Sequence, residues 1–101
     1  MNKVVRDGKV AVIISPDYGA GWYSWNGNSA MLFDPGLVGL IEEGNKEKIK
    51  TYINLKWPEE YLNVWHGLEV QWIPQGKKFR IVEYDGAESI QMLDQTDWLI
   101  A

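Results

Sequence analysis

The chain has 101 residues, of which 46% are hydrophobic, with no Cys and one His. This length fits a single domain over residues 1–101, and the lack of Cys excludes disulfides and thiolate ligands or nucleophiles. Ten Lys and Arg against fourteen Asp and Glu give a net charge of −4, the wrong sign for binding a nucleic-acid backbone along an extended face.

Membrane and export signals are also missing from the sequence pattern. No apolar run approaches the ~20 residues that a membrane-spanning helix needs. The N-terminal residues MNKVVRDGKV lack the apolar core of a signal peptide. We therefore expect a cytoplasmic protein without a membrane or nucleic-acid partner.

Aromatic side chains are unusually numerous, with six Trp and five Tyr. A domain of this size hides only about two thirds of the surface that its unfolded chain exposes. Eleven such rings are difficult to enclose completely, so some of them are expected at a subunit interface or a ligand surface. The composition thus favours a binding protein that forms a homo-oligomer.

The first third of the chain predicts strands followed by an aromatic loop. Asp7-Gly8 is a hairpin turn, and residues 10–14 form a β-branched run that ends before Pro16. Residues 15–28, SPDYGAGWYSWNGN, then combine turn residues with four aromatic rings and show no lasting helical or strand period. This segment is the most unusual part of the sequence.

The middle third predicts a helical hairpin. Residues 30–33 fit a short strand, and Asp34-Pro35 is a favourable helix start, with a carboxylate that can cap free amides and Pro at the first helical position. Gly44 is expected to end this helix in a left-handed conformation, and Asn45 to cap a second one. Trp57-Pro58 ends the second helix.

The last third predicts a meander of three antiparallel strands. Residues 68–73 alternate apolar and polar side chains, end at Pro74 and turn at Gln75-Gly76. A strand from Phe79, a second turn at Asp85-Gly86 and a strand over residues 89–93 follow, and a final segment contains Trp98 and Ile100. The element order predicts an α+β fold, an antiparallel sheet with a helical hairpin packed on one face.

Catalytic patterns are weak. His66 is the only histidine, and no Ser lies in a G-x-S-x-G setting, so neither a paired-histidine metal site nor a serine triad is predicted. Glu83, Asp85 and Glu88 could supply an acid/base pair, but a hairpin turn explains them more simply. We expect no enzyme activity, no cofactor and no metal.

The aromatic loop is the main candidate for a ligand site. Its G-A-G sequence, Gly19 and Gly21, lacks the further Gly, Lys and Ser or Thr of a phosphate loop. Backbone amides beside aromatic rings nevertheless suit a planar, partly anionic ligand such as a nucleotide. The predicted ligand-binding residues are Tyr18, Gly19, Gly21, Trp22, Tyr23, Trp25 and Arg80, with Arg6 as an alternative cation.

Two other interpretations of this loop stay open. In the first, the loop is structural, and its rings fold back on the sheet while the glycines allow positive φ or close packing. In the second, the rings form an interface with another protein subunit, where Trp and Tyr anchors are common.

Three blocks of the sequence resemble small uncharacterised proteins encoded by tailed bacteriophages. The blocks are ISPDYGAGWYSWN at residues 14–26, LFDPGLVGLIEEG at residues 32–44 and FRIVEYDGAESI at residues 79–90, and together they cover over a third of the chain. The resemblance implies a protein of the host cytoplasm that acts by binding a host factor or by sequestering a small molecule. It assigns no binding residue.

Three functional hypotheses follow. The first is a phage-type, non-enzymatic binding protein that sequesters a nucleotide-like immune signal, as counter-defence sponges do. The second is a protein-interaction module that inhibits a host factor through an acidic surface or an aromatic anchor. The third, and the weakest, is a small hydrolase that uses Asp85 and Glu88.

Overall fold

The computed structural model describes residues 2–60 and 67–92. Within them the strands are β1 (Val5–Arg6), β2 (Lys9–Ile14), β3 (Glu69–Pro74), β4 (Phe79–Tyr84) and β5 (Ala87–Met92). The helices are α1 (Ala30–Phe33), α2 (Pro35–Glu43) and α3 (Lys46–Lys56). The predicted α+β class is confirmed, whereas the predictions for His66, Trp98 and Ile100 lie outside the described residues.

The strand β2 lies at the centre of the fold. It pairs antiparallel with β1 on one side and with β3 on the other, for example Val10 with Ile73. The connection between β1 and β2 is the predicted Asp7-Gly8 turn, in which both residues have positive φ, 51° and 75°. Such turns match the natural twist of a hairpin.

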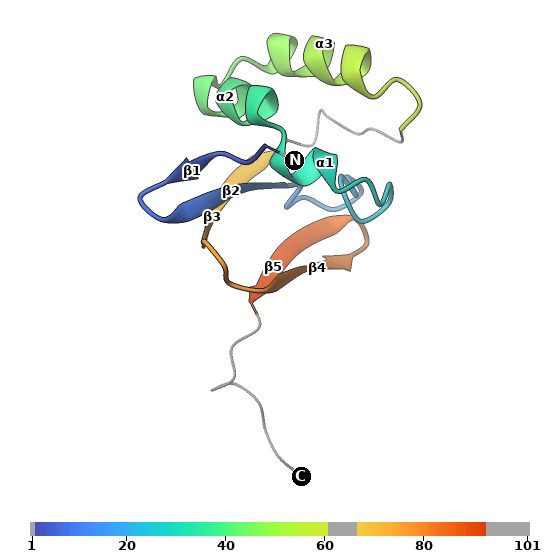
Figure 1. Cartoon of the computed structure of the whole chain (residues 1–101). Coiled ribbons are helices and arrows are strands. Elements are labelled where there is room, and N and C mark those ends of the chain that lie inside the picture. The colour runs from blue at the N-terminus through green and yellow to red at the C-terminus, as the bar shows by residue number, and fades with distance from the viewer. Residues whose placement is uncertain (1, 61–66, 93–101) are drawn as a thin grey trace.

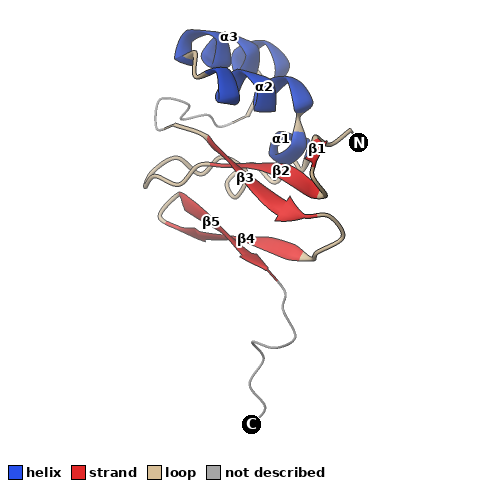
Figure 2. Ribbon diagram, turned by 90° about the vertical axis from the view of Figure 1, so that its left-hand side faces the viewer, coloured by secondary structure: helices blue, strands red, loops and turns tan. Residues whose placement is uncertain are grey.

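Three layers build the molecule, with α2 and α3 on one face of the β1–β2–β3 sheet and the β4–β5 hairpin on the other (Figures 1 and 2). Ala11 and Ile13 of β2 belong to the core beneath the helices, and Val12 and Ile14 belong to the core beneath the hairpin. Because both faces are covered, β2 is a continuous apolar run and does not alternate with polar residues.

The helical hairpin follows the predicted end signals. The Asp34 carboxylate accepts a hydrogen bond from the Leu37 amide at 2.9 Å, and Asn45 accepts one from the Lys48 amide at 3.1 Å. Gly44 ends α2 with φ 81°. None of the helices within residues 2–60 and 67–92 is long and apolar enough to span a membrane.

The predicted strand at residues 30–33 is wrong. Residues 30–33 form the helix α1, not a strand, and bury Met31, Leu32 and Phe33. A four-residue apolar run has no period that separates strand from helix, and here contacts with both cores favour the helix, since Met31 lies in one and Leu32 and Phe33 in the other.

The predicted three-strand meander is also wrong. β3 pairs with β2, and β4 and β5 form a separate two-stranded sheet. After Pro74 the chain moves to the other layer, where Phe79, Ile81 and Ile90 cover the second face of β2. Burial of that apolar face favours stacking the hairpin on the sheet over extending the sheet edge.

Candidate functional site

The aromatic loop, residues 15–28, lies against the turn between β4 and β5. The Gly19 amide donates to the Asp85 carbonyl at 2.6 Å, and the Gly21 amide donates to the Gly86 carbonyl at 2.8 Å. A Cβ on Gly86, whose φ is 84°, would lie 2.8 Å from the Gly19 nitrogen. The two backbones can approach this closely only because Gly86 has no side chain.

Glu88 of β5 fixes the loop through main-chain amides. Its side chain is 3% exposed and faces inward. One carboxylate oxygen accepts from the Ser15 amide at 3.0 Å, and the other accepts from the amides of Tyr23 and Ser24 at 2.8 and 2.6 Å. Three donors satisfy the buried carboxylate, as a buried charge requires. Glu88 therefore occupies the position that an external anion would take among these amides.

The loop amides predicted to lie beside a partly anionic ligand thus already have partners inside the protein. Those of Gly19 and Gly21 bond to the β4–β5 turn, and the Trp22 amide donates to the Ser15 hydroxyl at 2.9 Å. The amides of Tyr23 and Ser24 bond to Glu88. An anionic ligand would have to displace these bonds before it could use the loop amides.

Two of the four predicted rings belong to the core. The Trp22 side chain is 2% exposed, and its indole nitrogen donates to the Met31 carbonyl at 2.9 Å. Its ring meets the Trp57 ring edge-on, with centroids 5.6 Å apart. Tyr23 is half-buried and packs against both cores. Neither the Trp22 ring nor most of the Tyr23 ring is open to a ligand.

The other two rings face solvent. Tyr18 is 65% exposed and Trp25 is 41% exposed. The Trp25 ring lies directly over Gly21, where any Cβ would overlap it. Tyr18 meets Tyr84 of β4, itself 76% exposed, with ring centroids 6.2 Å apart and planes at 77°. This pair was not predicted, because its members are 66 residues apart in the sequence.

Acidic residues adjoin the two tyrosines in the sequence, Asp17 before Tyr18 and Glu83 and Asp85 on either side of Tyr84. We use "tyrosine surface" for the exposed residues Asp17, Tyr18, Glu83, Tyr84 and Asp85. The segments that build it, residues 15–28 and 81–89, contain no Lys or Arg. The tyrosine surface therefore combines exposed aromatic area with negative charge.

The cations predicted to neutralise a ligand lie elsewhere. Arg80 is at the opposite end of β4 from Tyr84, and its guanidinium donates to Gln91 at 2.7 Å. Arg6 forms a two-point ion pair with Glu42 of α2, with N–O distances of 2.7 and 2.9 Å. The structure brings neither arginine to the aromatic loop.

A second polar cluster joins the two long helices. The Asp34 carboxylate accepts a hydrogen bond from the Tyr52 hydroxyl at 2.5 Å and forms an ion pair with Lys56. Burial alone would raise the pKa of Asp34, but the hydrogen bonds from Lys56, Tyr52 and the Leu37 amide outweigh it and lower this pKa. The hydrogen bond to Asp34 raises the pKa of Lys56. The cluster is missed by sequence reasoning, although the i, i+4 spacing of Tyr52 and Lys56 is a usable signal.

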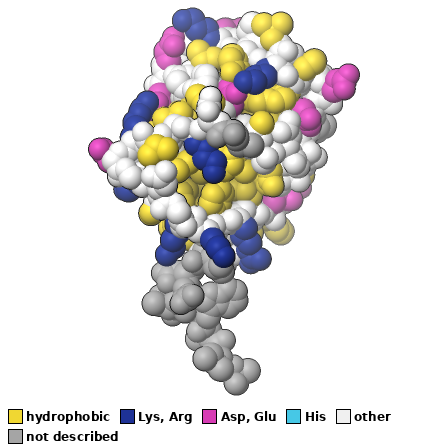
Figure 3. All heavy atoms as spheres, in the orientation of Figure 1, with side chains coloured by type: hydrophobic (Ala, Val, Ile, Leu, Met, Phe, Trp, Pro, Cys, Tyr) yellow, Lys and Arg dark blue, Asp and Glu magenta, His cyan; other side chains and the backbone are white. Residues whose placement is uncertain are grey.

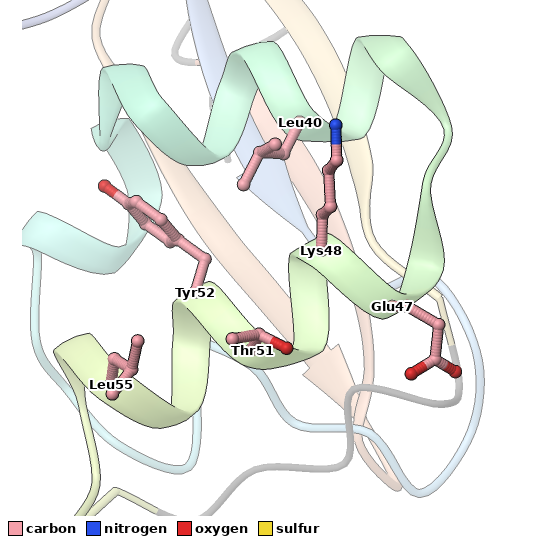
Figure 4. A pocket seen from close by; sticks show the side chains of 6 residues that line it. All are labelled: Leu40, Glu47, Lys48, Thr51, Tyr52 and Leu55. Carbon is pink, nitrogen blue, oxygen red and sulfur yellow. The ribbon is translucent and has the colours of Figure 1, made fainter.

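A shallow hollow lies between α2 and α3 and has a volume of about 420 Å³. Figure 4 shows that Lys48 and Tyr52 extend from α3 toward α2 on its two sides. The hollow is lined by Leu40, Glu47, Lys48, Thr51, Tyr52 and Leu55. It is open to solvent, unlike the concave pockets that enclose most of a small ligand. Within residues 2–60 and 67–92, no group of three or more His, Cys, Asp or Glu side chains could bind a metal ion.

No protein-family model, curated protein or solved structure matches the chain. Its function must therefore be inferred from the residues and contacts described above. Of the seven predicted ligand-binding residues, the structure brings six together in one loop and places Arg80 away from it. Whether that loop binds a ligand stays a prediction, and the same holds for the phage resemblance.

Proposed function

We propose that this protein is a non-enzymatic binding protein whose partner, another protein, docks on the tyrosine surface. The observation that carries the proposal is the pair Tyr18 and Tyr84. These residues are 65% and 76% exposed, yet their rings contact each other. Tyrosine is enriched among the residues that dominate binding energy at protein interfaces. In the phage setting implied by the sequence resemblance, the partner is a host protein whose activity the chain blocks.

The backbone beneath the pair supports this role. Tyr18 precedes Gly19, which is bonded to Asp85, and Tyr84 lies in β4 beside the same turn. Glu88 fixes the rest of the loop through three amides. A surface that is already ordered loses little conformational entropy on binding, so a larger part of the contact energy appears as affinity.

Several contacts weigh against the nucleotide-sponge hypothesis. The loop amides are bonded internally, Trp22 is buried, and both candidate arginines lie away from the loop. The carboxylates of the tyrosine surface would repel a phosphate. The hydrolase hypothesis is weakened as well, because the Glu88 carboxylate is buried under three amides.

Affinity capture with matched variants tests the proposal. The tagged chain is compared with a Tyr18→Ala/Tyr84→Ala variant and with Leu55→Ala, which removes an apolar side chain that is 78% exposed on α3. We expect a stoichiometric protein from bacterial lysate to be retained by the wild-type chain and Leu55→Ala, and lost with the double tyrosine variant. Equal recovery by all three chains would refute the tyrosine surface as the docking site.

Native mass spectrometry with a panel of cyclic and linear nucleotides tests the competing hypothesis. We expect no stoichiometric adduct on the folded wild-type chain. An adduct that survives Tyr18→Ala/Tyr84→Ala would instead favour a nucleotide ligand bound at another site.

A further inference from the structure

The end of the β4–β5 hairpin opposite the tyrosine surface has the reverse charge. The Gln75 amide donates to the Gly8 carbonyl at 2.8 Å, which places the β1–β2 turn beside the β3–β4 connection. We use "basic end" for the exposed residues that these segments and the start of β4 contribute, Lys9, Lys77, Lys78 and Arg80. Asp7 is the only acidic residue in residues 7–10 and 75–80.

Apolar surface accompanies these cations. Met92 is 44% exposed, and its cross-strand partner Phe79 is half-buried. Lys3 adds a further cation nearby, because its ammonium lies 4.5 Å from the centroid of the buried Phe33 ring, which meets the Phe79 ring edge-on. Figure 3 shows apolar atoms on this face with Lys and Arg side chains along the lower rim.

We propose that the basic end of one copy binds the tyrosine surface of a second copy. Asp17, Glu83 and Asp85 would face Lys9, Lys77, Lys78 and Arg80, so that opposite charges meet. The rings of Tyr18 and Tyr84 offer both apolar area and a negative face, which suit exposed methionine and Lys or Arg head groups. Each end thus offers what the other lacks.

The contact forms between two molecules because the basic end and the tyrosine surface of one molecule are too far apart to touch. The two ends are separated by the length of the hairpin, six residues per strand, or roughly 17 Å at ~3.4 Å per residue. Two different surfaces of identical subunits meet, so the association is head to tail and builds a ring or an open chain. It uses the tyrosine surface of the proposed function, and partner and second copy therefore compete for it.

Complementary variants test the inference by sedimentation analysis. Tyr18→Ala/Tyr84→Ala removes one surface, and Lys77→Glu/Lys78→Glu reverses the other. We expect the wild-type chain to self-associate about tenfold more weakly when NaCl rises from about 50 mM to about 500 mM, because salt screens exposed charges. Each variant alone stays monomeric, whereas an equimolar mixture forms a 1:1 dimer that grows no further, because only one matching pair of ends remains.

The control reverses the same number of charges at another place. Lys46→Glu/Lys50→Glu alters exposed residues of α3 and should self-associate like the wild-type chain. A monomeric wild-type chain, or a mixture of the two variants that forms no dimer, overturns the inference. Either result leaves the proposed function standing, since Lys77→Glu/Lys78→Glu retains the tyrosine surface and is expected to capture the same partner.

Discussion

Two regions of this molecule are each organised around a buried carboxylate, and they differ in the groups that donate hydrogen bonds to that carboxylate. Asp34, which is 6% exposed, caps α2. Its carboxylate accepts a hydrogen bond from the Tyr52 hydroxyl and forms an ion pair with the Lys56 ammonium, both from α3. Glu88, which is 3% exposed, accepts hydrogen bonds from three main-chain amides of the aromatic loop. One carboxylate joins two helices that already have their own hydrogen bonds, and the other orders a segment without regular structure.

Because of this difference, we expect the loss of Asp34 and the loss of Glu88 to destabilise the protein to different extents. When Asp34 is lost, Tyr52 and Lys56 can turn to water, since the Lys56 side chain is 46% exposed. When Glu88 is lost, the amides cannot move without unfolding the loop, and unsatisfied buried donors are costly. Substitution of the carboxylate should therefore destabilise the aromatic loop more than the helical hairpin. The exposed rings of the loop should tolerate substitution as long as Glu88 is present.

Glu88→Ala is expected to have the largest effect. Each stranded amide costs about 1–3 kcal/mol, so three together approach the whole stability of a small domain, about 5–15 kcal/mol. Urea unfolding followed by circular dichroism measures the loss. Glu88→Gln, which keeps the size and one acceptor oxygen, should lie between Ala and wild type. A loss below about 1 kcal/mol for Glu88→Ala would contradict the central role of this carboxylate.

Gly86→Ala comes next. The substitution forces a side chain into a left-handed conformation, which costs about 1–2 kcal/mol, and places a Cβ 2.8 Å from the Gly19 and Ala20 nitrogens. Gly76→Ala is the matched control, because Gly76 has φ 83° with nothing within 4 Å of the added Cβ. Thermal unfolding should show a clearly larger loss for Gly86→Ala. Equal losses would mean that the close approach of loop and turn is unimportant.

The Asp34 cluster should contribute less, and its contribution should depend on pH. A carboxyl whose pKa is lowered in the folded state stabilises fully above its unfolded pKa, ~3.9, and this stability disappears as pH falls through the folded value. Asp34→Asn keeps an N-cap side chain but loses the ion pair, so it should remove part of the stability loss below about pH 4. An identical acid profile for Asp34→Asn and wild type would refute the assignment.

Tyr84→Ala is expected to have the smallest effect on stability, within about 0.5 kcal/mol, because the ring is 76% exposed. Trp22→Ala in the same region should cost about 3–5 kcal/mol, since that ring is buried. Chemical denaturation of both variants measures this contrast. A large loss for Tyr84→Ala would show that the tyrosine pair serves the fold and would remove the main support for a docking surface.

Local signals were reliable wherever the interactions were local. The caps Asp34 and Asn45, the end at Gly44 and the turns Asp7-Gly8 and Asp85-Gly86 all follow the sequence pattern. Each depends on hydrogen bonds or φ values within a few residues. The predictions for α1 and for the meander were wrong because packing between distant segments, and not local preference, decides these structures.

The candidate site was predictable only in part. The aromatic loop stood out through its composition, but the sequence does not separate buried Trp22 from exposed Tyr18, since both lie in a segment without a period. Tyr84, which completes the exposed pair, and Glu88, which orders the loop, come from the other end of the chain. Their hydrogen bonds and ring contacts exist only once the hairpin has stacked on the sheet.

By itself, the sequence determined the fold class, the helical hairpin with its caps, the central strand and the aromatic composition of the loop. The tertiary structure decided which rings are exposed, that Glu88 is an internal anion for the loop amides, and that acidic and basic residues gather at opposite ends of the β4–β5 hairpin. The division has one physical reason: caps and turns are short-range interactions, whereas burial and charge separation depend on residues brought together across the whole chain.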